Sequence, residues 1–109
     1  MNANQRRREL EALRDTLEER LQRYRAHQHR EAGPLDKDLG EQALEIENDE
    51  VIDRLEEEAR GELDQVKRAL TRLAEGNGSR CERCGVSIDP GRLQALPATT
   101  RCLACASHP

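Results

Sequence analysis

Aromatic residues are almost absent from this chain of 109 residues, which has one tyrosine and neither phenylalanine nor tryptophan. Only 35% of its residues are hydrophobic and 37% are charged, so one compact core cannot enclose the whole chain. We therefore expect an extended molecule. Its formal charge of −4 and its lack of stacking residues make direct sequence-specific DNA binding unexpected, and a protein partner fits better.

Long hydrophobic runs are also missing, since no stretch approaches the roughly 20 apolar residues that span a membrane. The first residues include Arg6, Arg7 and Arg8 but no apolar segment typical of secretory signals. We expect a cytoplasmic protein without membrane contact, whose thiols stay reduced. The three arginines are expected to form a solvated terminal turn, with contact to a partner protein or nucleic acid as the alternative.

Four cysteines are what the chain does contain, in two close pairs: Cys81 with Cys84, and Cys102 with Cys105. Two CxxC pairs separated by seventeen residues are typical of a structural Zn²⁺ site. Four thiolates complete a tetrahedral shell with no open position for substrate, which indicates one structural zinc ion and no enzymatic role. Gly85 follows the first pair, where a knuckle requires positive φ so that N–H groups approach the sulfurs.

A disulfide framework and a thioredoxin-like redox pair are the alternative interpretations of these cysteines. A redox pair would be surrounded by a βαβ pattern, which neither CxxC has. A disulfide framework is typical of secreted proteins, and no signal sequence is seen. The sequence favours a small C-terminal four-cysteine zinc finger, which we place at residues 77–109.

Hydrophobic residues at helical spacing predict two long helices before the zinc finger. The first is expected from about Asn4 to about His29 and the second from about Leu39 to about Glu75. The first seam consists of Leu10, Leu13, Leu17, Leu21 and Tyr24, and the second of Val51 or Ile52, Leu55, Ala59, Leu63, Val66, Leu70 and Leu73. Gly76 and the two residues after it are expected to end the second helix.

The break at Gly33 and Pro34 allows the two helices to fold back as an antiparallel coiled-coil hairpin over residues 1–76. In such a hairpin the residue numbers of two facing residues add up to a constant. A sum of 76 places the hydrophobic residues of the first helix opposite those of the second. The expected pairs are Tyr24 with Ile52, Leu21 with Leu55, Leu17 with Ala59, Leu13 with Leu63, and Leu10 with Val66. We expect a monomer, and pairing of the seams between two chains is the alternative.

The turn of the hairpin carries an acidic tip at residues 31–43. Asp38 and Glu41 have the spacing of a capping box, which would simply begin the second helix. A second interpretation does not exclude the first: a long rod presents tip carboxylates to Mg²⁺ or to cationic side chains of a partner.

The hairpin and zinc segment together resemble the DksA/TraR family of bacterial transcription factors. The residues that carry the resemblance are Ala69, Leu70, Arg72, Leu73, Gly76, Cys81, Cys84, Gly85, Ile88, Arg92, Leu93, Ala95, Pro97, Cys102 and Cys105. Counted back from Cys81 without a gap, the tip signature of the family, Asp-x-x-Asp-x-Ala, falls on Asp38, Glu41 and Ala43. Glu41 departs from the signature by one methylene.

The resemblance implies a regulator of transcription within the stringent response, with bacterial RNA polymerase as its partner. Members of the family insert the coiled-coil tip into the secondary channel of the polymerase and alter the stability of open complexes. Two other functions are considered: a Gre-like transcript-cleavage factor, whose tip acids would hold a second Mg²⁺, and a zinc-stapled protein-interaction or dimerisation module.

Other departures from the family pattern lie near the zinc segment. Gly78 and Ser79 replace a common aromatic-glycine pair. Where members that respond to ppGpp carry basic residues, this chain has Gln65, Leu96 and Ala106. We expect at most weak ppGpp binding, at an interface shared with the polymerase.

Overall fold

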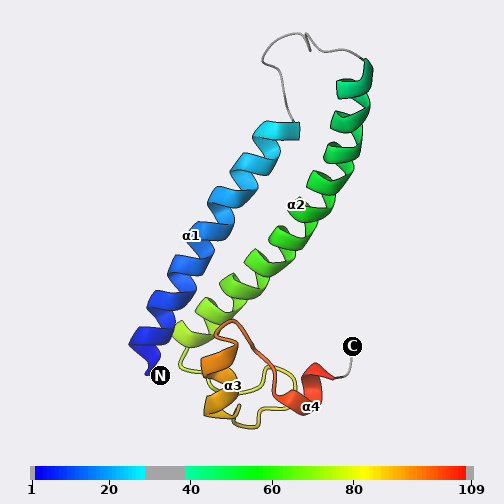
Figure 1. Ribbon diagram of the computed structural model, residues 1–109. Coiled ribbons are helices and arrows are strands. Elements are labelled where there is room, and N and C mark those ends of the chain that lie inside the picture. Colours follow the sequence, from blue (N-terminus) through cyan, green and yellow to red (C-terminus); the bar gives the residue numbers. More distant parts are fainter. Residues whose placement is uncertain (1, 29–38, 108–109) are drawn as a thin grey trace.

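The computed structural model describes residues 2–28 and 39–107, and for residues 28 and 39–49 the description is limited to the backbone. The described residues form four helices: α1 (Ala3–Gln28), α2 (Leu39–Ala74), α3 (Pro90–Ala95) and α4 (Leu103–Ala106). The long helices α1 and α2 lie side by side and antiparallel (Figure 1). The segment with α3 and α4 folds against the end of the hairpin where α1 begins and α2 ends. The chain is mainly α-helical, as predicted.

The molecule is elongated, with extents of 57 × 28 × 19 Å and a Cα radius of gyration of 18.6 Å. A compact domain of this length would have a radius of gyration of about 13 Å. At 1.5 Å per residue the 26 residues of α1 span about 39 Å and the 36 residues of α2 about 54 Å. The extended shape expected from the shortage of hydrophobic residues is confirmed. Within the described ranges, no helix combines the length and the apolarity that crossing a membrane requires.

Both long helices begin and end within one residue of their predicted limits. Gly76 ends α2 with a φ of +84°, the left-handed conformation expected there. Its N–H donates to the carbonyl of Leu73 at 3.1 Å, and the N–H of Asn77 donates to that of Arg72 at 2.9 Å. These bonds satisfy carbonyls that the end of the helix would otherwise leave without a partner.

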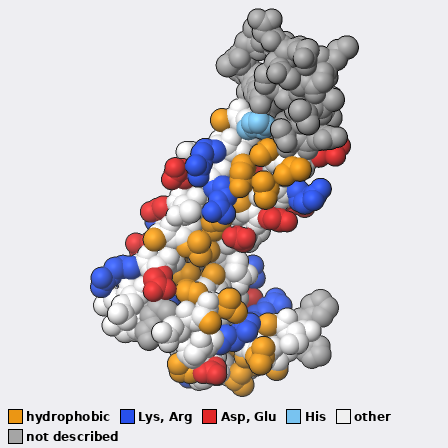
Figure 2. All heavy atoms as spheres, viewed as in Figure 1, with side chains coloured by type: hydrophobic (Ala, Val, Ile, Leu, Met, Phe, Trp, Pro, Cys, Tyr) orange, Lys and Arg blue, Asp and Glu red, His pale blue; other side chains and the backbone are white. Residues whose placement is uncertain are grey.

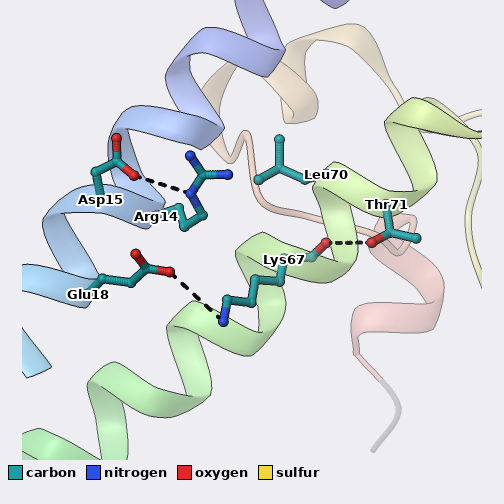
Figure 3. Close-up of a pocket in the computed structure, with 6 residues that line it drawn as sticks. All are labelled: Arg14, Asp15, Glu18, Lys67, Leu70 and Thr71. Carbon is teal, nitrogen blue, oxygen red and sulfur yellow. Dashed lines mark hydrogen bonds and ion pairs between the residues drawn. The ribbon is translucent and has the colours of Figure 1, made fainter.

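On the face seen in Figure 2, charged side chains flank a line of hydrophobic side chains along the hairpin. Ion pairs among the described residues cross from one helix to the other. Glu18 of α1 lies 3.9 Å from Lys67 of α2 at a shallow surface hollow (Figure 3). Arg25 of α1 lies 3.5 Å from Glu56 of α2. A pair that is exposed on both sides, such as Glu18 with Lys67, adds at most about 1 kcal/mol, so the packing beneath the ion pairs holds the helices together.

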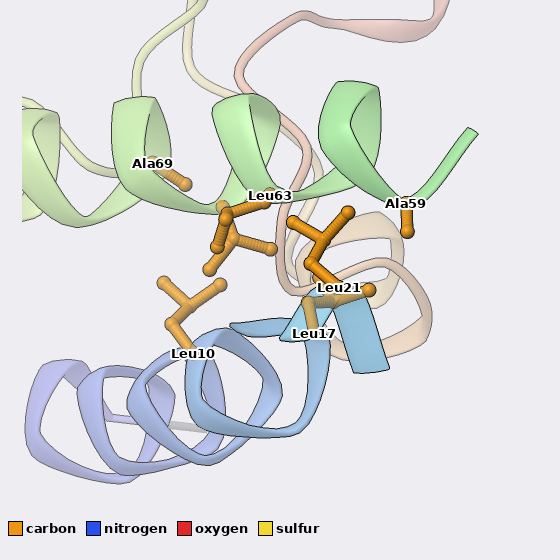
Figure 4. Packing of buried hydrophobic residues seen from close by; sticks show 7 residues of the cluster. Leu10, Leu17, Leu21, Ala59, Leu63 and Ala69 are labelled. Carbon is orange, nitrogen blue, oxygen red and sulfur yellow. The ribbon is translucent and has the colours of Figure 1, made fainter. Parts of the chain in front are cut away.

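The core of the hairpin is one cluster of aliphatic side chains between α1 and α2 (Figure 4). Its buried members are Leu10, Leu17, Leu21, Ala59, Leu63, Val66 and Ala69. Leu10 lies toward Ala69 at one end of the cluster. Leu21 lies toward Ala59 at the other end, as an antiparallel arrangement requires. Each fully buried leucine contributes roughly 1.5–3 kcal/mol.

The predicted register of the two seams is wrong. It placed Leu13 and Leu55 between the helices, yet each of these side chains is 37% exposed. Glu56, which was not assigned to the seam, is buried instead. The prediction failed because leucines repeat every three or four residues, so a slip of one helical turn still sets one apolar side chain against another.

The buried residues fit a register shifted by about one helical turn along α2. In that register Leu17 faces Leu63, and Leu21 faces Ala59 in place of Leu55. The shift leaves Leu13 at the edge of the seam, where it lines a hollow beside the residues that follow α3. The first half of α1 therefore lies against the residues that follow α3.

Candidate metal centre

The first cysteine pair is held in a tight turn a short distance beyond the end of α2. The N–H of Gly85 donates to the carbonyl of Cys81 at 3.0 Å, and the N–H of Cys81 donates to that of Val86 at 2.8 Å. Gly85 has a φ of +80°, as predicted for a knuckle, and a residue with a side chain would be strained there. Cys81 is buried at the base of this turn, and Cys84 lies exposed on its outer side.

The second cysteine pair is positioned by α4. Cys102 is the residue directly before this short helix, and its carbonyl accepts the N–H of Ala106 at 2.9 Å. Cys105 lies within the same helical turn. Residues three apart on a helical turn share one face, so the two sulfurs point toward the first pair.

The sulfurs of Cys81, Cys84, Cys102 and Cys105 all lie within 4.8 Å of one another, and all four cysteines are free thiols. Zn–S bonds of about 2.3 Å in tetrahedral geometry place sulfurs about 3.8 Å apart. The Sγ atoms of Cys84 and Cys102 are 3.7 Å apart, which fits this spacing. The cluster thus fits one structural zinc ion, which these four side chains would hold.

The pKa values of the thiols show why a cation suits the cluster. Burial raises the pKa of Cys81, but backbone N–H groups of Cys102, Cys84 and Arg83 stabilise its thiolate more strongly and lower the pKa to about 5. The hydrogen bond with the thiol of Cys102, together with burial, raises the pKa of Cys105 to about 12. Four packed sulfurs cannot all ionise unaided, and a divalent cation supplies the charge that lets them do so.

Glu82 ties the first knuckle to the rest of the molecule. Its N–H donates to the carbonyl of Thr100 at 2.8 Å. Its carboxylate lies 3.2 Å from Arg68 of α2 and 3.1 Å from Arg101. Burial raises the pKa of Glu82, but the hydrogen bonds from Arg101 and Thr100 and the charge of Arg68 outweigh it, so the pKa falls below its usual value. Glu82 therefore links α2 to both halves of the finger.

Arg6 does not form the solvated turn expected from the sequence. Its side chain is 5% exposed and donates three hydrogen bonds to backbone carbonyls of the C-terminal part. Nε donates to Pro97 and Nη2 to Thr99, both at 3.0 Å, and Nη1 donates to Gly78. The hydrophobic pattern gives no signal for this role, because the partners lie more than seventy residues away in the sequence.

The residues predicted for the tip are placed only in part. Asp38 lies outside the described residues. Glu41 and Ala43 lie in the first turns of α2, where the description is limited to the backbone. These turns are at the end of the hairpin opposite the cysteine cluster (Figure 1). The roles of the three residues stay predictions.

Comparison with known proteins matches residues 76–107 to the prokaryotic dksA/traR C4-type zinc finger. An uncharacterized protein of Aquifex aeolicus is 32% identical over 72 residues, which are 66% of this chain and 48% of that protein. The RNA polymerase-binding transcription factor DksA of Escherichia coli K12 is 29% identical over 103 residues, with 91% of this chain covered. The chain spans 65% of the length of that factor.

The solved structure of transcription factor DksA2 from Pseudomonas aeruginosa is similar to this chain over both of its parts. The TM-score is 0.79 at 27% sequence identity. The superposition covers 96% of this chain and 80% of the other. The hairpin and the four-cysteine finger thus share one arrangement with a solved relative.

Proposed function

Since the chain belongs to the DksA/TraR family and carries its C4 zinc finger, we propose that it regulates transcription by binding bacterial RNA polymerase. In this proposal the tip of the hairpin enters the secondary channel of the polymerase and acts near the active site. The protein works as a cytoplasmic monomer and catalyses no reaction itself.

The likeness to the DksA2 structure is the observation that carries this proposal, because it extends over 96% of the chain. A likeness confined to the zinc finger would support only a metal-binding module. The E. coli relative is an RNA polymerase-binding transcription factor, and we propose the same kind of partner for this chain on the basis of that similarity.

The long hairpin suits a protein that places negatively charged side chains far from its zinc finger. The zinc finger braces one end of the hairpin, and α2 extends for about 54 Å from that end. Asp38 and Glu41 lie in the sequence at the far end of α2, so their carboxylates would reach a site that the finger does not. Four thiolates around one zinc ion leave no open coordination position, which fits a bracing metal and not a catalytic one.

Asp38→Asn tests the proposal with purified bacterial RNA polymerase. Asparagine caps a helix about as well as aspartate, so stability should change little while the carboxylate is lost. We expect binding to the polymerase to persist and the effect on transcription from a sensitive promoter to disappear. Glu62→Gln, which removes an exposed carboxylate in the middle of α2, serves as the control and should keep the full effect.

Two results would contradict the proposal. Failure of the zinc-loaded protein to bind the polymerase would exclude a polymerase regulator, and a mass in light scattering well above 12.4 kDa would then favour a dimerisation module. Cleavage of backtracked RNA, stimulated by the wild type and not by Asp38→Asn, would instead indicate a Gre-like factor that acts through Mg²⁺.

A further inference from the structure

Four successive residues after α3, Pro97 to Thr100, are held alternately by the two helices of the hairpin. Arg6 of α1 donates to the carbonyls of Pro97 and Thr99, at 3.0 Å each. Gln65 of α2 donates through Nε2 to the carbonyl of Ala98 at 2.9 Å and to Oγ1 of Thr100 at 3.3 Å. Ala98 also packs against the hairpin core. The segment 97–100 is thus fixed from both helices at once.

The same segment leads directly into the metal centre. Thr100 accepts the N–H of Glu82, next to Cys81, and lies two residues before Cys102. The third hydrogen bond of Arg6 goes to Gly78, three residues before Cys81. Arg6 therefore holds the chain where it enters the finger and again before it reaches the second cysteine pair.

The chemistry of Arg6 suits this position. No ion pair is found for it among the described residues, so its charge is solvated by carbonyl groups alone. Burial lowers the pKa of Arg6, yet a guanidinium stays protonated in proteins and keeps all its donors. A lysine would offer one nitrogen in place of a planar fork and would not reach three carbonyls on two loops.

From this geometry we infer that Arg6 and Gln65 form a clamp that sets the direction of the hairpin relative to the zinc finger. A small change of angle at the clamp produces a large displacement at the far end of the hairpin, because the molecule is 57 Å long. A tilt of about 10° at the clamp would move the far end by about 10 Å, more than an active-site contact tolerates. Resting on the proposed function, the inference makes Arg6 a positioning residue for the tip.

Residual dipolar couplings of the zinc-loaded protein measure this direction without reference to activity. In the wild type, couplings from α1, α2 and residues 80–105 should fit one alignment tensor. In Arg6→Ala the alignment of the finger should fall by about twofold or more relative to the hairpin. Amide exchange in residues 97–100 should rise by about tenfold, because local opening becomes easier.

Matched variants separate a clamp from a general loss of structure. Gln65→Ala attacks the same segment from α2 and should give the same change, and Arg6→Lys should recover only part of the wild-type behaviour. Arg7→Ala removes an exposed neighbour that pairs with Glu11 at 3.7 Å, and should have no effect. All variants should keep one zinc ion per chain and the helical circular dichroism of the wild type.

Unchanged couplings and exchange in both Arg6→Ala and Gln65→Ala would overturn the clamp. A changed direction with a full effect on transcription, while Asp38→Asn abolishes that effect, would overturn the positioning role. If the wild type itself has no effect on transcription, the proposed function has failed, and the couplings still decide whether the clamp exists.

Discussion

Gly78 shows how closely one residue can be constrained by packing alone. A Cβ atom placed there would lie 2.6 Å from Cδ1 and 3.0 Å from Cα of Leu73, and 3.1 Å from Nη1 of Arg6. The absence of a side chain lets the chain cross Leu73 and brings the carbonyl of Gly78 to Arg6. Glycine is required here for close approach, whereas Gly76 and Gly85 are required for positive φ.

Gly78→Ala should therefore destabilise the protein by about 1–3 kcal/mol, because the contact with the backbone of Leu73 cannot relax freely. Gly61→Ala is the matched control, since its Cβ would meet nothing within 4 Å inside α2. That change should stabilise the helix by about 0.5–1 kcal/mol. Chemical unfolding followed by circular dichroism measures the change in unfolding free energy for each variant. Equal changes of the same sign would contradict the close contact of Gly78 with Leu73.

At the metal centre, Cys84→Ser should abolish stable zinc binding, because one of the four thiolates is lost. Structural zinc contributes about 10–16 kcal/mol in small zinc-finger peptides, so residues near 80–105 should lose their order. The helical signal should largely persist, because the core of the hairpin contains no cysteine. Metal analysis and circular dichroism are the measurements, with exposed Arg83→Ser as the control, and one zinc ion per chain in Cys84→Ser would refute its role as a ligand.

The ends of the two long helices could be predicted from the sequence, but the register in which the helices pair could not. The ends of α1 and α2 follow from local signals such as the hydrophobic period and Gly76, which act within a few residues. The register depends on which of several equivalent turns is chosen. The observed register also includes contacts outside the seam, such as the ion pair of Arg25 with the buried Glu56. The hydrophobic repeat of the sequence does not predict these contacts.

Leu17→Ala and Leu13→Ala distinguish the two registers. Leu17 is 1% exposed in the core, so its truncation should cost about 2–4 kcal/mol. Leu13 is 37% exposed at the edge of the seam, and its truncation should cost less than about 1.5 kcal/mol. Thermal unfolding of the zinc-loaded proteins measures the difference. Equal losses would restore the register in which both leucines are buried.

For the whole molecule, the sequence predicted the two parts but not how they are joined. The cysteine spacing indicated the metal centre, because ligand spacing is local to each pair. The bonds from Arg6 and Gln65 to residues 97–100 were not predictable, since they exist only after the chain has folded back. The division of the chain into residues 1–76 and 77–109 stays a prediction, and these bonds cross it.

The three described positions that the family resemblance links to ppGpp carry no basic side chain. Leu96 and Ala106 are exposed and uncharged, and Gln65 is engaged with Ala98. Two nearby cations have partners within the protein, since Nε of Arg92 donates to the carbonyl of Arg101 at 3.1 Å and Arg101 lies 3.1 Å from the carboxylate of Glu82. Phosphates are held strongly only by close charge-assisted contacts, so we expect weak dependence on ppGpp.

Titration of ppGpp into a transcription assay, with and without this protein, checks this expectation. The combined effect should not exceed the separate effects by a large factor. Leu96→Arg combined with Ala106→Lys adds two cations at exposed positions and should create or enlarge synergy. The same double substitution to glutamine is the uncharged control. Strong synergy in the wild type would show that other residues bind the phosphates.

Site-specific photocrosslinking tests whether the tip of the hairpin reaches the interior of RNA polymerase, as we propose. A photoreactive amino acid at Ala43 near the tip should crosslink to polymerase segments that line the secondary channel. The same group at Arg83, on an exposed turn of the zinc finger, should crosslink only outside the channel. Crosslinks from Ala43 to the outer surface of the polymerase, with the finger still crosslinked to it, would show that the tip does not enter the channel.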